Sequence, residues 1–374
     1  MTAPSHITTE RVETLEGVDA LAAEWTALEN ATPEATGFQS FAWCRTWLAV
    51  AGDRAQARVL CVRDEGRLAM LLPLQVERRL GVVIARWIGE SMTQYGDALA
   101  LPGEKRAQWI AAAQAKMARW DDVDLFALTR LRAGGVMSDG TVAGEPFSAP
   151  YVDLRASKPK RHKSIERRVK RLEAHGAILL EEAESPAKRE SVTRHALALK
   201  RAWLGGKGAY SAGLSNPISE DFLAALAREG FLRANILRVG GEIGAIDLGF
   251  VGGGAYRSLL GCYDDRFAEG SPGQALTGRL IARCAEEGLS AYDMLLPADA
   301  YKSAWATGET RIEARFLPTS LKGHAAAFVF AELRPLAKRM VRAAGPSCAR
   351  LMSAFSFSRR PASLSPSRRE ETAT

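Results

Sequence analysis

The passage RSLLGCYDDRFAEGSPGQALTGRLIARCAEEG, residues 257–288, indicates a strand, a turn and a helix in direct succession. The apolar residues that end at Tyr263 are typical of a strand, and Gly270 marks the turn. Ser271 is a good N-cap residue and Pro272 fits the first helical position, so a helix is expected to begin here. Unpaired N–H groups and the positive end of the helix dipole suit such a terminus to an anion. Strand, turn and capped helix is a common arrangement, so this passage alone leaves phosphate binding open.

The second half of the chain surrounds this passage with further strands and helices. Apolar runs bounded by glycine turns indicate antiparallel strands, and apolar residues at helical spacing indicate helices. We expect strands at 177–182, 231–239, 243–251, 255–263, 289–295 and 312–317, and helices at 185–203, 218–230 and 271–287. The glycine-rich stretch between Leu204 and Asn216 is either a mobile lid or acceptor loop or a plain surface connection.

The first half shows a similar order of elements. We expect a strand at 7–15, helices at 18–30 and 41–50, strands at 57–62 and 68–76 around the turn Asp64-Glu65-Gly66, a strand at 82–88, a helix at 104–120 and a strand at 123–128. The shared order predicts a duplicated unit, although no residue-level repeat links the halves. The expected fold class is α/β (α+β), in which each unit is a mixed, mostly antiparallel twisted sheet flanked by helices.

Composition and charge exclude several protein classes. The chain has 374 residues, of which 47% are hydrophobic and 25% charged, which excludes collagen, coiled coil and wholesale disorder. This length predicts two domains. The net charge of +7 lies entirely in residues 334–374, where nine Lys/Arg face two Glu, and residues 1–333 are neutral. The basic pI is therefore a property of the tail, which argues against a nucleic-acid-binding body.

Cysteine, histidine and hydropathy patterns exclude further classes. The five cysteines are odd in number and lack C-x-x-C spacing, so a reducing cytoplasm is expected rather than a disulfide framework or a zinc site. The five histidines show no ligand spacing, so no bound metal is expected. No signal-peptide pattern and no run of about 18 apolar residues occurs, which predicts a soluble or peripheral protein. No G-x-S-x-G elbow or Walker-type loop is present.

Two basic segments could meet an anionic partner. Residues 155–171, RASKPKRHKSIERRVKR, hold nine Lys/Arg and one Glu, and form either a solvated helix between two domains or an anion contact. Residues 325–346 are expected to form a basic amphipathic helix, interrupted by Pro335, that lies on an anionic membrane face or packs back on the domain. Residues 347–374 are rich in Ser, Arg and Pro and are expected to be disordered.

Short motifs in both halves make the chain resemble a known superfamily. The motifs are KSIERRVKRLEAHG at 163–176, Ser271-Pro272-Gly273 with Leu276 and Leu280-Ile281, Ala291-Tyr292-Asp293, Tyr301-Lys302 with Trp305, Phe38-Gln39-Ser40 with Trp43 and Trp47, and Gln94-Tyr95-Gly96-Asp97. With them the chain resembles GNAT-superfamily N-acyltransferases of the cellulose-biosynthesis-associated branch, close to the Fem-type peptidoglycan aminoacyltransferases. The resemblance covers most of residues 10–320. It implies tandem GNAT-like domains at 1–154 and 155–324, followed by the basic helix at 325–346 and the tail at 347–374.

The resemblance implies an acyl-CoA co-substrate, with no bound cofactor, at the strand–helix passage. The strand that ends at Cys262 and Tyr263 would pair its backbone with the pantetheine arm. The pyrophosphate would be held by the amides of Gly270, Ser271, Gly273 and Gln274. The family's phosphate loop has Arg or Gln, two spacers, Gly, a spacer, then Gly or Ala, and residues 269–273 match it in part. The donor is therefore either acyl-CoA or, as in the Fem branch, aminoacyl-tRNA.

The resemblance further implies direct attack of an amine on the donor carbonyl, without a covalent enzyme intermediate. The amine must lose a proton, so a carboxylate is needed near the strand ends. Asp293 and Asp247 each interrupt an apolar strand, where an unpaired carboxylate is costly and so has a partner or a function. Asp293 could instead form a structural pair with Lys302. Tyr301 and Lys302 either donate hydrogen bonds to the oxyanion or the departing thiolate, or anchor the loop.

The expected function is N-acyl transfer to an amine on a sugar, a lipid or a cell-envelope precursor. The resemblance supplies these acceptors, because relatives act on envelope and exopolysaccharide precursors and on sphingoid-type lipid amines. The expected location is the cytoplasm, with the basic C-terminal segment as a contact to the inner membrane. Two alternatives stay open: aminoacyl transfer from a charged tRNA held by residues 158–171, and a non-catalytic accessory role in exopolysaccharide biosynthesis. No nucleic acid other than tRNA is expected as a partner.

Overall fold

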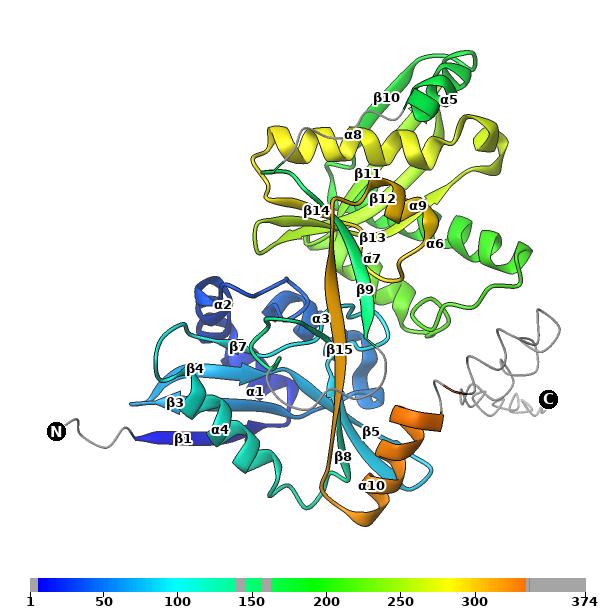
Figure 1. Cartoon of the computed structure of the whole chain (residues 1–374). Helices are drawn as coiled ribbons and strands as arrows, with labels where there is room; N and C mark the ends of the chain where they lie inside the picture. Colours follow the sequence, from blue (N-terminus) through cyan, green and yellow to red (C-terminus); the bar gives the residue numbers. More distant parts are fainter. Residues whose placement is uncertain (1–5, 139–145, 157–162, 334–335, 337–374) are drawn as a thin grey trace, which may run out of the picture.

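A computed structural model describes residues 6–138, 146–156, 163–333 and 336. The molecule has two lobes, one formed mainly by each half of the chain, and Figure 1 shows β15 running from one lobe to the other. The lobes are built from mixed sheets flanked by helices, so the predicted fold class is confirmed.

The first lobe contains the elements from β1 to β8. They are β1 (Ile7–Val12), α1 (Leu15–Ala20), α2 (Ala22–Ala31), α3 (Phe41–Ala51), β2 (Gln56–Ala57), β3 (Val59–Asp64), β4 (Arg67–Leu72), β5 (Leu74–Arg79), β6 (Val82–Trp87), β7 (Leu99–Ala100), α4 (Arg106–Met117) and β8 (Leu125–Arg132).

The remaining elements build the second lobe and return to the first. They are β9 (Phe147–Asp153), α5 (Lys163–Glu173), β10 (Ile178–Glu182), α6 (Pro186–Gly206), α7 (Ser219–Arg228), β11 (Arg233–Val239), β12 (Glu242–Gly252), β13 (Ala255–Tyr263), the 3₁₀ turn η2 (Asp265–Gly270), α8 (Pro272–Glu286), β14 (Ala291–Asp293), α9 (Ala300–Trp305), β15 (Gly308–Pro318), α10 (Leu321–Phe328) and the π-helical turn η3 (Val329–Leu333).

One eleven-stranded sheet runs through both lobes in the order β10-β11-β12-β13-β14-β9-β15-β8-β6-β5-β2. The first part of β15 pairs with β9 from Gly308 to Ile312, and its second part pairs with β8 from Ile312 to Pro318. β9, which precedes the domain boundary predicted at 154/155, pairs with β14 of the second lobe. The boundary stays a prediction, but the backbone pairing is continuous across it.

The predicted strand at 68–76 is wrong as a single element. It divides at Pro73 into β4, which joins a separate four-stranded sheet in the order β1-β3-β4-β7, and β5, which joins the large sheet. Proline cannot donate to a strand ladder, so it separates the two pairings. The hairpin predicted at Asp64-Glu65-Gly66 is confirmed as the β3–β4 turn, where Glu65 and Gly66 both have positive φ.

Other boundaries also differ from the sequence predictions. The single helix predicted at 18–30 is two helices, α1 and α2, and the Thr14 side chain caps the first by accepting from the Gly17 amide. β9 and α9 were not predicted. β9 contains Pro150, which disfavours a strand, and α9 has only 6 residues. The stretch predicted as a loop from Leu204 begins inside α6, which continues to Gly206.

Aromatic side chains join the two lobes into one core. Trp43 of α3 packs edge-on against Phe222 of α7, with ring centroids 4.9 Å apart. Phe38 makes similar contacts with Trp43 at 4.9 Å and with Phe250 of β12 at 5.1 Å. All four rings are almost fully buried. Aromatic pairs of this kind stabilise a fold by more than the area they bury would contribute. These contacts therefore hold the two lobes in a fixed arrangement.

The C-terminal helix begins earlier than predicted. Ser320 caps α10 by accepting from the Gly323 amide, and Ala326, Ala327 and Phe330 pack on β6, β8 and β15. Most of the segment predicted at 325–346 and all of the tail at 347–374 lie outside the described residues. Within the described part, no helix combines the length and apolarity that a bilayer span requires.

Candidate active site

β13 and β14 separate shortly after they begin. They pair in parallel over three positions, from Ala255 with Ala291 to Arg257 with Asp293. β13 continues to Tyr263 along β12, whereas β14 ends at Asp293. Among the described residues, no strand pairs with the other edge of residues 258–263. A gap therefore opens in the sheet where these two strands diverge.

The exposed edge of β13 carries backbone groups that face away from β12. The Asp264 amide donates to the Gly244 carbonyl at 3.0 Å and so points toward β12. Successive residues of an antiparallel strand turn their backbone groups to opposite sides, so those of Tyr263 and Gly261 face the gap. Lys200 Nζ of α6 donates to the Gly261 carbonyl at 2.9 Å, in agreement with this direction. The edge can thus form hydrogen bonds with a ligand in the gap.

The N-terminus of α8 lies at the end of β13. Pro272 occupies the first helical position, as predicted. Ser271 stands at the N-cap position, but its φ of 53° is left-handed and its side chain makes no capping bond, so the predicted hydroxyl cap is wrong. The Gln274 and Ala275 amides donate instead to the Ser271 carbonyl, at 3.0 and 3.1 Å. This bonding leaves the Ser271 hydroxyl available to another partner.

The two glycines of the predicted phosphate loop have different environments. A Cβ added to Gly270 would lie 2.3 Å from Leu172 Cδ2, so this glycine is required for the packing of α5. A Cβ added to Gly273 would have Tyr263 Cδ1 at 3.6 Å as its nearest neighbour. Gly273 therefore borders open space beside β13, where a ligand could approach the first turn of α8.

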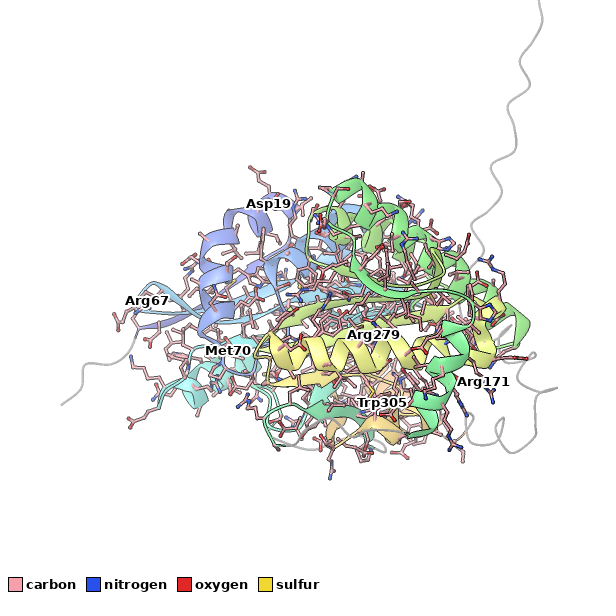
Figure 2. All side chains as sticks on the ribbon, turned by 90° about the horizontal axis from the view of Figure 1, so that it is seen from above. Asp19, Arg67, Met70, Arg171, Arg279 and Trp305 are labelled. Atoms are coloured by element: carbon pink, nitrogen blue, oxygen red, sulfur yellow. The ribbon has the colours of Figure 1, made fainter. Side chains whose placement is uncertain are left out.

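The basic helix α5 packs over this helix terminus. Arg168 Nη1 donates to Ser271 Oγ at 3.1 Å, and the apolar residues Ile165, Val169 and Leu172 face the second-lobe core. Figure 2 shows the helix that carries Arg171 beside α8, which carries Arg279. The two interpretations of residues 155–171, a solvated helix and an anion contact, both stay predictions. Arg168 belongs to the basic run that the sequence predictions offered as a tRNA contact, but they did not place it at the α8 terminus.

Asp247 is buried on β12, behind the gap, with two hydroxyl donors. Tyr256 Oη donates to Asp247 Oδ1 at 2.6 Å, and Ser258 Oγ donates to Asp247 Oδ2. Burial raises the pKa of Asp247 to about 6, although these hydroxyls and the charges of Arg283 and Lys302 oppose the rise. The carboxylate is thus ionised near neutral pH and can accept a proton. Ser258, which the sequence predictions missed, lies on β13 directly after the last position that pairs with β14.

Tyr256 belongs to a buried chain of polar groups. Asn235 Nδ2 donates to Tyr256 Oη at 2.7 Å, and Arg283 of α8 donates to Asn235 Oδ1. Arg283 Nη2 also lies 3.0 Å from Glu182 Oε2 on β10. These contacts fix the tyrosine hydroxyl and with it the orientation of Asp247.

Tyr301 and Lys302 lie on α9, which contacts α8 and the segment that follows β14. The Tyr301 hydroxyl is hydrogen-bonded to Thr277 Oγ1 of α8, and burial raises its pKa to about 12. Lys302 Nζ donates to the Leu295 carbonyl at 3.0 Å. Burial lowers the Lys302 pKa to about 8, and the carboxylate of Asp299, followed by those of Asp293 and Asp247, opposes this shift. Both groups are mainly protonated at neutral pH and can donate hydrogen bonds.

Asp293 has different surroundings, at the contact between the lobes. Tyr95 Oη of the first lobe donates to Asp293 Oδ1 at 2.8 Å, and the Leu295 amide donates to the same oxygen at 2.9 Å. Burial raises its pKa, whereas the Arg257 and Arg132 charges lower it. The alternative that Asp293 forms a structural pair with Lys302 is wrong. Asp293 is paired with Tyr95, and Lys302 donates to the Leu295 carbonyl.

Cys262 and Tyr263 face opposite sides of the sheet. Cys262 packs in the core shared by α6 and the first lobe, and Tyr263 packs in the core beneath α8. Burial raises the pKa of the Cys262 thiol to about 12, so it is not a thiolate nucleophile at neutral pH. Among the described residues, no three His, Cys, Asp or Glu side chains gather as a metal site would require.

Residues 159–303 match the family described as acetyltransferase (GNAT) domain. They contain the diverging strands, α8 and α9. The predicted resemblance to the GNAT superfamily is therefore confirmed for this part of the chain. No curated protein sequence matches the chain.

Solved structures share the fold at low sequence identity. FemX is 11% identical with a TM-score of 0.57, over 82% of this chain and 96% of that one. A conserved protein of unknown function from Bacteroides thetaiotaomicron is 12% identical with a TM-score of 0.51, over 83% and 99%. The C-terminal domain of a putative lysylphosphatidylglycerol synthetase from Agrobacterium fabrum is 13% identical with a TM-score of 0.50, over 85% and 97%. The fold is thus shared with these three proteins over nearly their whole length.

Proposed function

We propose that the protein is an acyl-CoA-dependent N-acyltransferase that acylates an amine on a sugar, a lipid or another cell-envelope precursor. The observation that carries this proposal is the gap between β13 and β14, which opens beside the N-terminus of α8. The amide-bearing arm of such a donor needs a strand edge, and its diphosphate needs an anion site next to that edge. β13 and α8 supply these two features from consecutive parts of the chain.

The donor would lie with its arm along Gly261 to Tyr263 and its diphosphate over Gly273. Three features support this placement: the outward backbone groups of β13, the free space at Gly273 and the guanidinium of Arg168. Arg168 would transfer its hydrogen bond from Ser271 to the diphosphate, since Arg binds phosphate with several donors.

The chemistry would be direct attack of the acceptor amine on the donor thioester carbonyl. Asp247 would accept the proton of the amine through Ser258, which passes its own proton to the carboxylate. Lys302 or Tyr301 would donate to the developing oxyanion or protonate the departing thiolate. The new bond is the amide and the broken bond is the thioester. Asp293 would fix the position of the two lobes relative to each other through its hydrogen bond with Tyr95.

A binding titration tests the donor. The purified protein is titrated with CoA, acetyl-CoA and a long-chain acyl-CoA, together with the Gly273→Trp and Gly206→Trp variants. Gly206 ends α6 in open space, so its variant is a matched control for the new indole. We expect binding by wild type and Gly206→Trp and its loss in Gly273→Trp. Equal binding by all three proteins would refute the assigned diphosphate site, and no binding at all would refute the acyl-CoA donor.

A charged-tRNA donor is the second candidate, and the α5 surface favours it. Arg167, Arg168, Lys170 and Arg171 are all on this helix beside the α8 terminus, on its solvent-accessible side. A variant in which all four residues are replaced by neutral ones should bind tRNA more weakly. The slope of log binding constant against log salt concentration should become shallower by about one for each phosphate that the protein no longer neutralises. An unchanged slope would exclude α5 as the tRNA-binding surface. If neither CoA compounds nor charged tRNA bind, the accessory role replaces both proposals.

A membrane contact through the C-terminal segment belongs to the same proposal. Leu321, Phe328 and Leu333 are 89%, 58% and 46% exposed, on the part of the segment that is not packed on the sheet. A chain that ends at Leu336 keeps α10 and loses most of the basic residues of the tail. We expect it to bind anionic liposomes more weakly than the full chain. Unchanged binding would exclude the tail as a lipid contact.

A further inference from the structure

Leu80 stands at the tip of the β5–β6 hairpin, where its side chain is 81% exposed. Leu80 and Gly81 form a two-residue turn between the paired residues Arg79 and Val82, and both have positive φ. The left-handed conformation is unfavourable for Leu, and Asn, Asp or Gly usually occupies the first position of such a turn. The hairpin therefore exposes a large apolar side chain at a position that disfavours it.

Three other hairpins in the described chain have the same kind of turn. Two-residue turns with positive φ also join β3 to β4, β11 to β12 and β12 to β13. Their first residues are Glu65, Gly240 and Gly253. Leu80 is thus not a general feature of these turns. An exposed apolar side chain in an unfavourable conformation points to a function at this tip.

The helix α10 also exposes large apolar side chains. The side that faces the sheet carries small residues, which are Gly323, Ala326 and Ala327. A Cβ added to Gly323 would lie 1.7 Å from the Asp124 carbonyl oxygen, so the helix backbone lies against the start of β8. The exposed large residues of α10 and of the position after it are Leu321, Phe328 and Val329. A surface helix normally turns its large apolar residues toward the core, and α10 does the reverse.

Asp124 connects the hairpin to the start of α10. The Val83 amide donates to Asp124 Oδ2 at 2.8 Å, and Ser320 Oγ donates to Asp124 Oδ1 at 2.5 Å. Further residues of the two segments belong to one small apolar cluster: Val82, Ala326, Ala327 and Phe330. Figure 1 shows α10 beside β8 and β5. Leu80 and Leu321 therefore lie at the same end of the first lobe.

Basic side chains accompany these leucines. Among the described residues of the hairpin, α10 and η3, the exposed Lys, Arg, Asp and Glu side chains are Arg78, Arg79, Lys322 and Glu332. The hydrogen bond from Ser320 lowers the pKa of Asp124, and the nearby charges of Lys322 and Arg78 lower it as well. Residues 334–342 continue the sequence with four Lys/Arg and no Asp/Glu. Apolar side chains beside cations suit an anionic bilayer, whereas a second copy of the surface would bring like charges together.

We propose that Leu80 and the exposed side of α10 form one surface that inserts into the interface of an anionic bilayer. The inference deepens the lipid contact of the proposed function, in which the basic tail is the contact. Here the folded end of the first lobe anchors the chain through apolar side chains, and the cations attract it to the bilayer. Because both segments belong to one lobe, this contact would also fix the orientation of the chain on the bilayer.

Vesicle co-sedimentation of the full chain tests the surface. Vesicles of phosphatidylcholine alone are compared with vesicles that also contain phosphatidylglycerol. Leu80→Asn is the decisive variant, because Asn tolerates the left-handed conformation and the fold should be at least as stable as in wild type. Leu179→Thr is the matched control, because Leu179 is 55% exposed on β10 of the second lobe and Thr suits a strand.

We expect wild type and Leu179→Thr to bind the anionic vesicles equally. Leu80→Asn should bind them about tenfold more weakly, since one leucine no longer leaves water. The double variant Leu80→Asn/Leu321→Ser should bind more weakly still. Brominated lipids give a second readout: they should quench the added indole of Leu80→Trp and leave that of Leu179→Trp unquenched.

Equal vesicle affinity of wild type and Leu80→Asn, or an unquenched indole in Leu80→Trp, would overturn the proposal. A wild-type dimer in size-exclusion chromatography that Leu80→Asn abolishes would assign the surface to a second copy instead. The acyl-CoA titration reports on α8 and is independent of vesicle binding. Vesicle binding without CoA binding would keep this surface and remove the proposed transfer. CoA binding without vesicle binding would do the reverse.

Discussion

Asp247 and Asp293 are two buried carboxylates on neighbouring parts of one sheet, and their surroundings differ. They are 4% and 6% exposed, and burial raises both pKa values. Asp247 accepts from the hydroxyls of Tyr256 and Ser258 beside the gap. Asp293 accepts from Tyr95 of the other lobe and from a backbone amide, and lies in the field of two arginines.

This difference teaches that burial alone does not identify a catalytic carboxylate. A guanidinium nearby stabilises the ionised form of Asp293 and favours a fixed structural role. The donors of Asp247 are hydroxyls, and a hydroxyl can pass a proton on. We therefore assign proton transfer to Asp247 and the joining of the lobes to Asp293.

The largest expected effect is on turnover in Asp247→Asn. The amide keeps an acceptor for the hydroxyls but cannot take a proton, so the transfer rate should fall about 10²- to 10⁴-fold. Donor affinity should stay close to wild type, because Asp247 lies behind β13 and not at α8. Steady-state kinetics and a donor titration measure the two quantities. A rate within a few fold of wild type would remove Asp247 from the mechanism.

Asp293→Asn should act on stability instead. The substitution removes the negative charge beside the buried Arg257 guanidinium, and breaking a buried charge pair costs about 3–5 kcal/mol. Urea unfolding measures the free energy of unfolding. Asp247→Asn is the internal comparison and should cost less. If Asp293→Asn is as stable as wild type and loses turnover, the two assignments must be exchanged.

The pH dependence sharpens the assignment of Asp247. Its folded pKa of about 6 exceeds the ordinary 3.8, so the folded state binds the proton more tightly than the unfolded state. Wild type should therefore gain stability relative to Asp247→Asn as the pH falls from about 6 to about 4, by about 1.4 kcal/mol per pH unit. The transfer rate should fall over the same range, because the base must be ionised. If the stability of wild type and that of Asp247→Asn change with pH in parallel, the raised pKa of Asp247 is contradicted.

The smallest expected effects come from the tyrosines that donate to each carboxylate. Tyr95→Phe and Tyr256→Phe each remove one hydrogen bond to a buried charged group, at a cost of about 1.5–3 kcal/mol in unfolding free energy. Tyr256→Phe should also raise the pKa of Asp247 and so move the acidic limb of the pH–rate profile to higher pH. Tyr95→Phe should leave that limb unchanged. Equal profiles in the two variants would show that Tyr256 does not tune Asp247.

The sequence predicted the second lobe better than the first. β13 has the predicted bounds, and α8 begins one residue from the predicted start, because capping and turn residues mark both ends of this passage. The division of 68–76 at Pro73 was missed, since the apolar pattern continues across it. The crossing of β15 between the lobes could not be read from periodicity, because strand partners are set by tertiary packing.

The candidate site was predicted in its parts and not in its arrangement. Tyr263 and Gly273 lie beside the gap, Lys302 contacts the segment that follows β14, and Asp247 lies behind the gap on β12. A carboxylate in an apolar strand was the signal that singled out Asp247. Ser258 and Lys200 were missed, and Arg168 was named only as part of a possible tRNA contact. Each is an ordinary surface or strand residue in sequence, and only the packing of distant segments brings it to the gap.

Amide hydrogen exchange along β13, with and without acetyl-CoA, tests the central claim that the donor lies between the diverging strands. Bound donor should protect the amides of residues 258–263, most of all Tyr263, because its N–H faces the gap and gains a partner. The amides of β11, which are paired on both sides, should exchange at the same rate in both states and serve as the control. Tight binding of acetyl-CoA with no change in exchange along β13 would contradict the account.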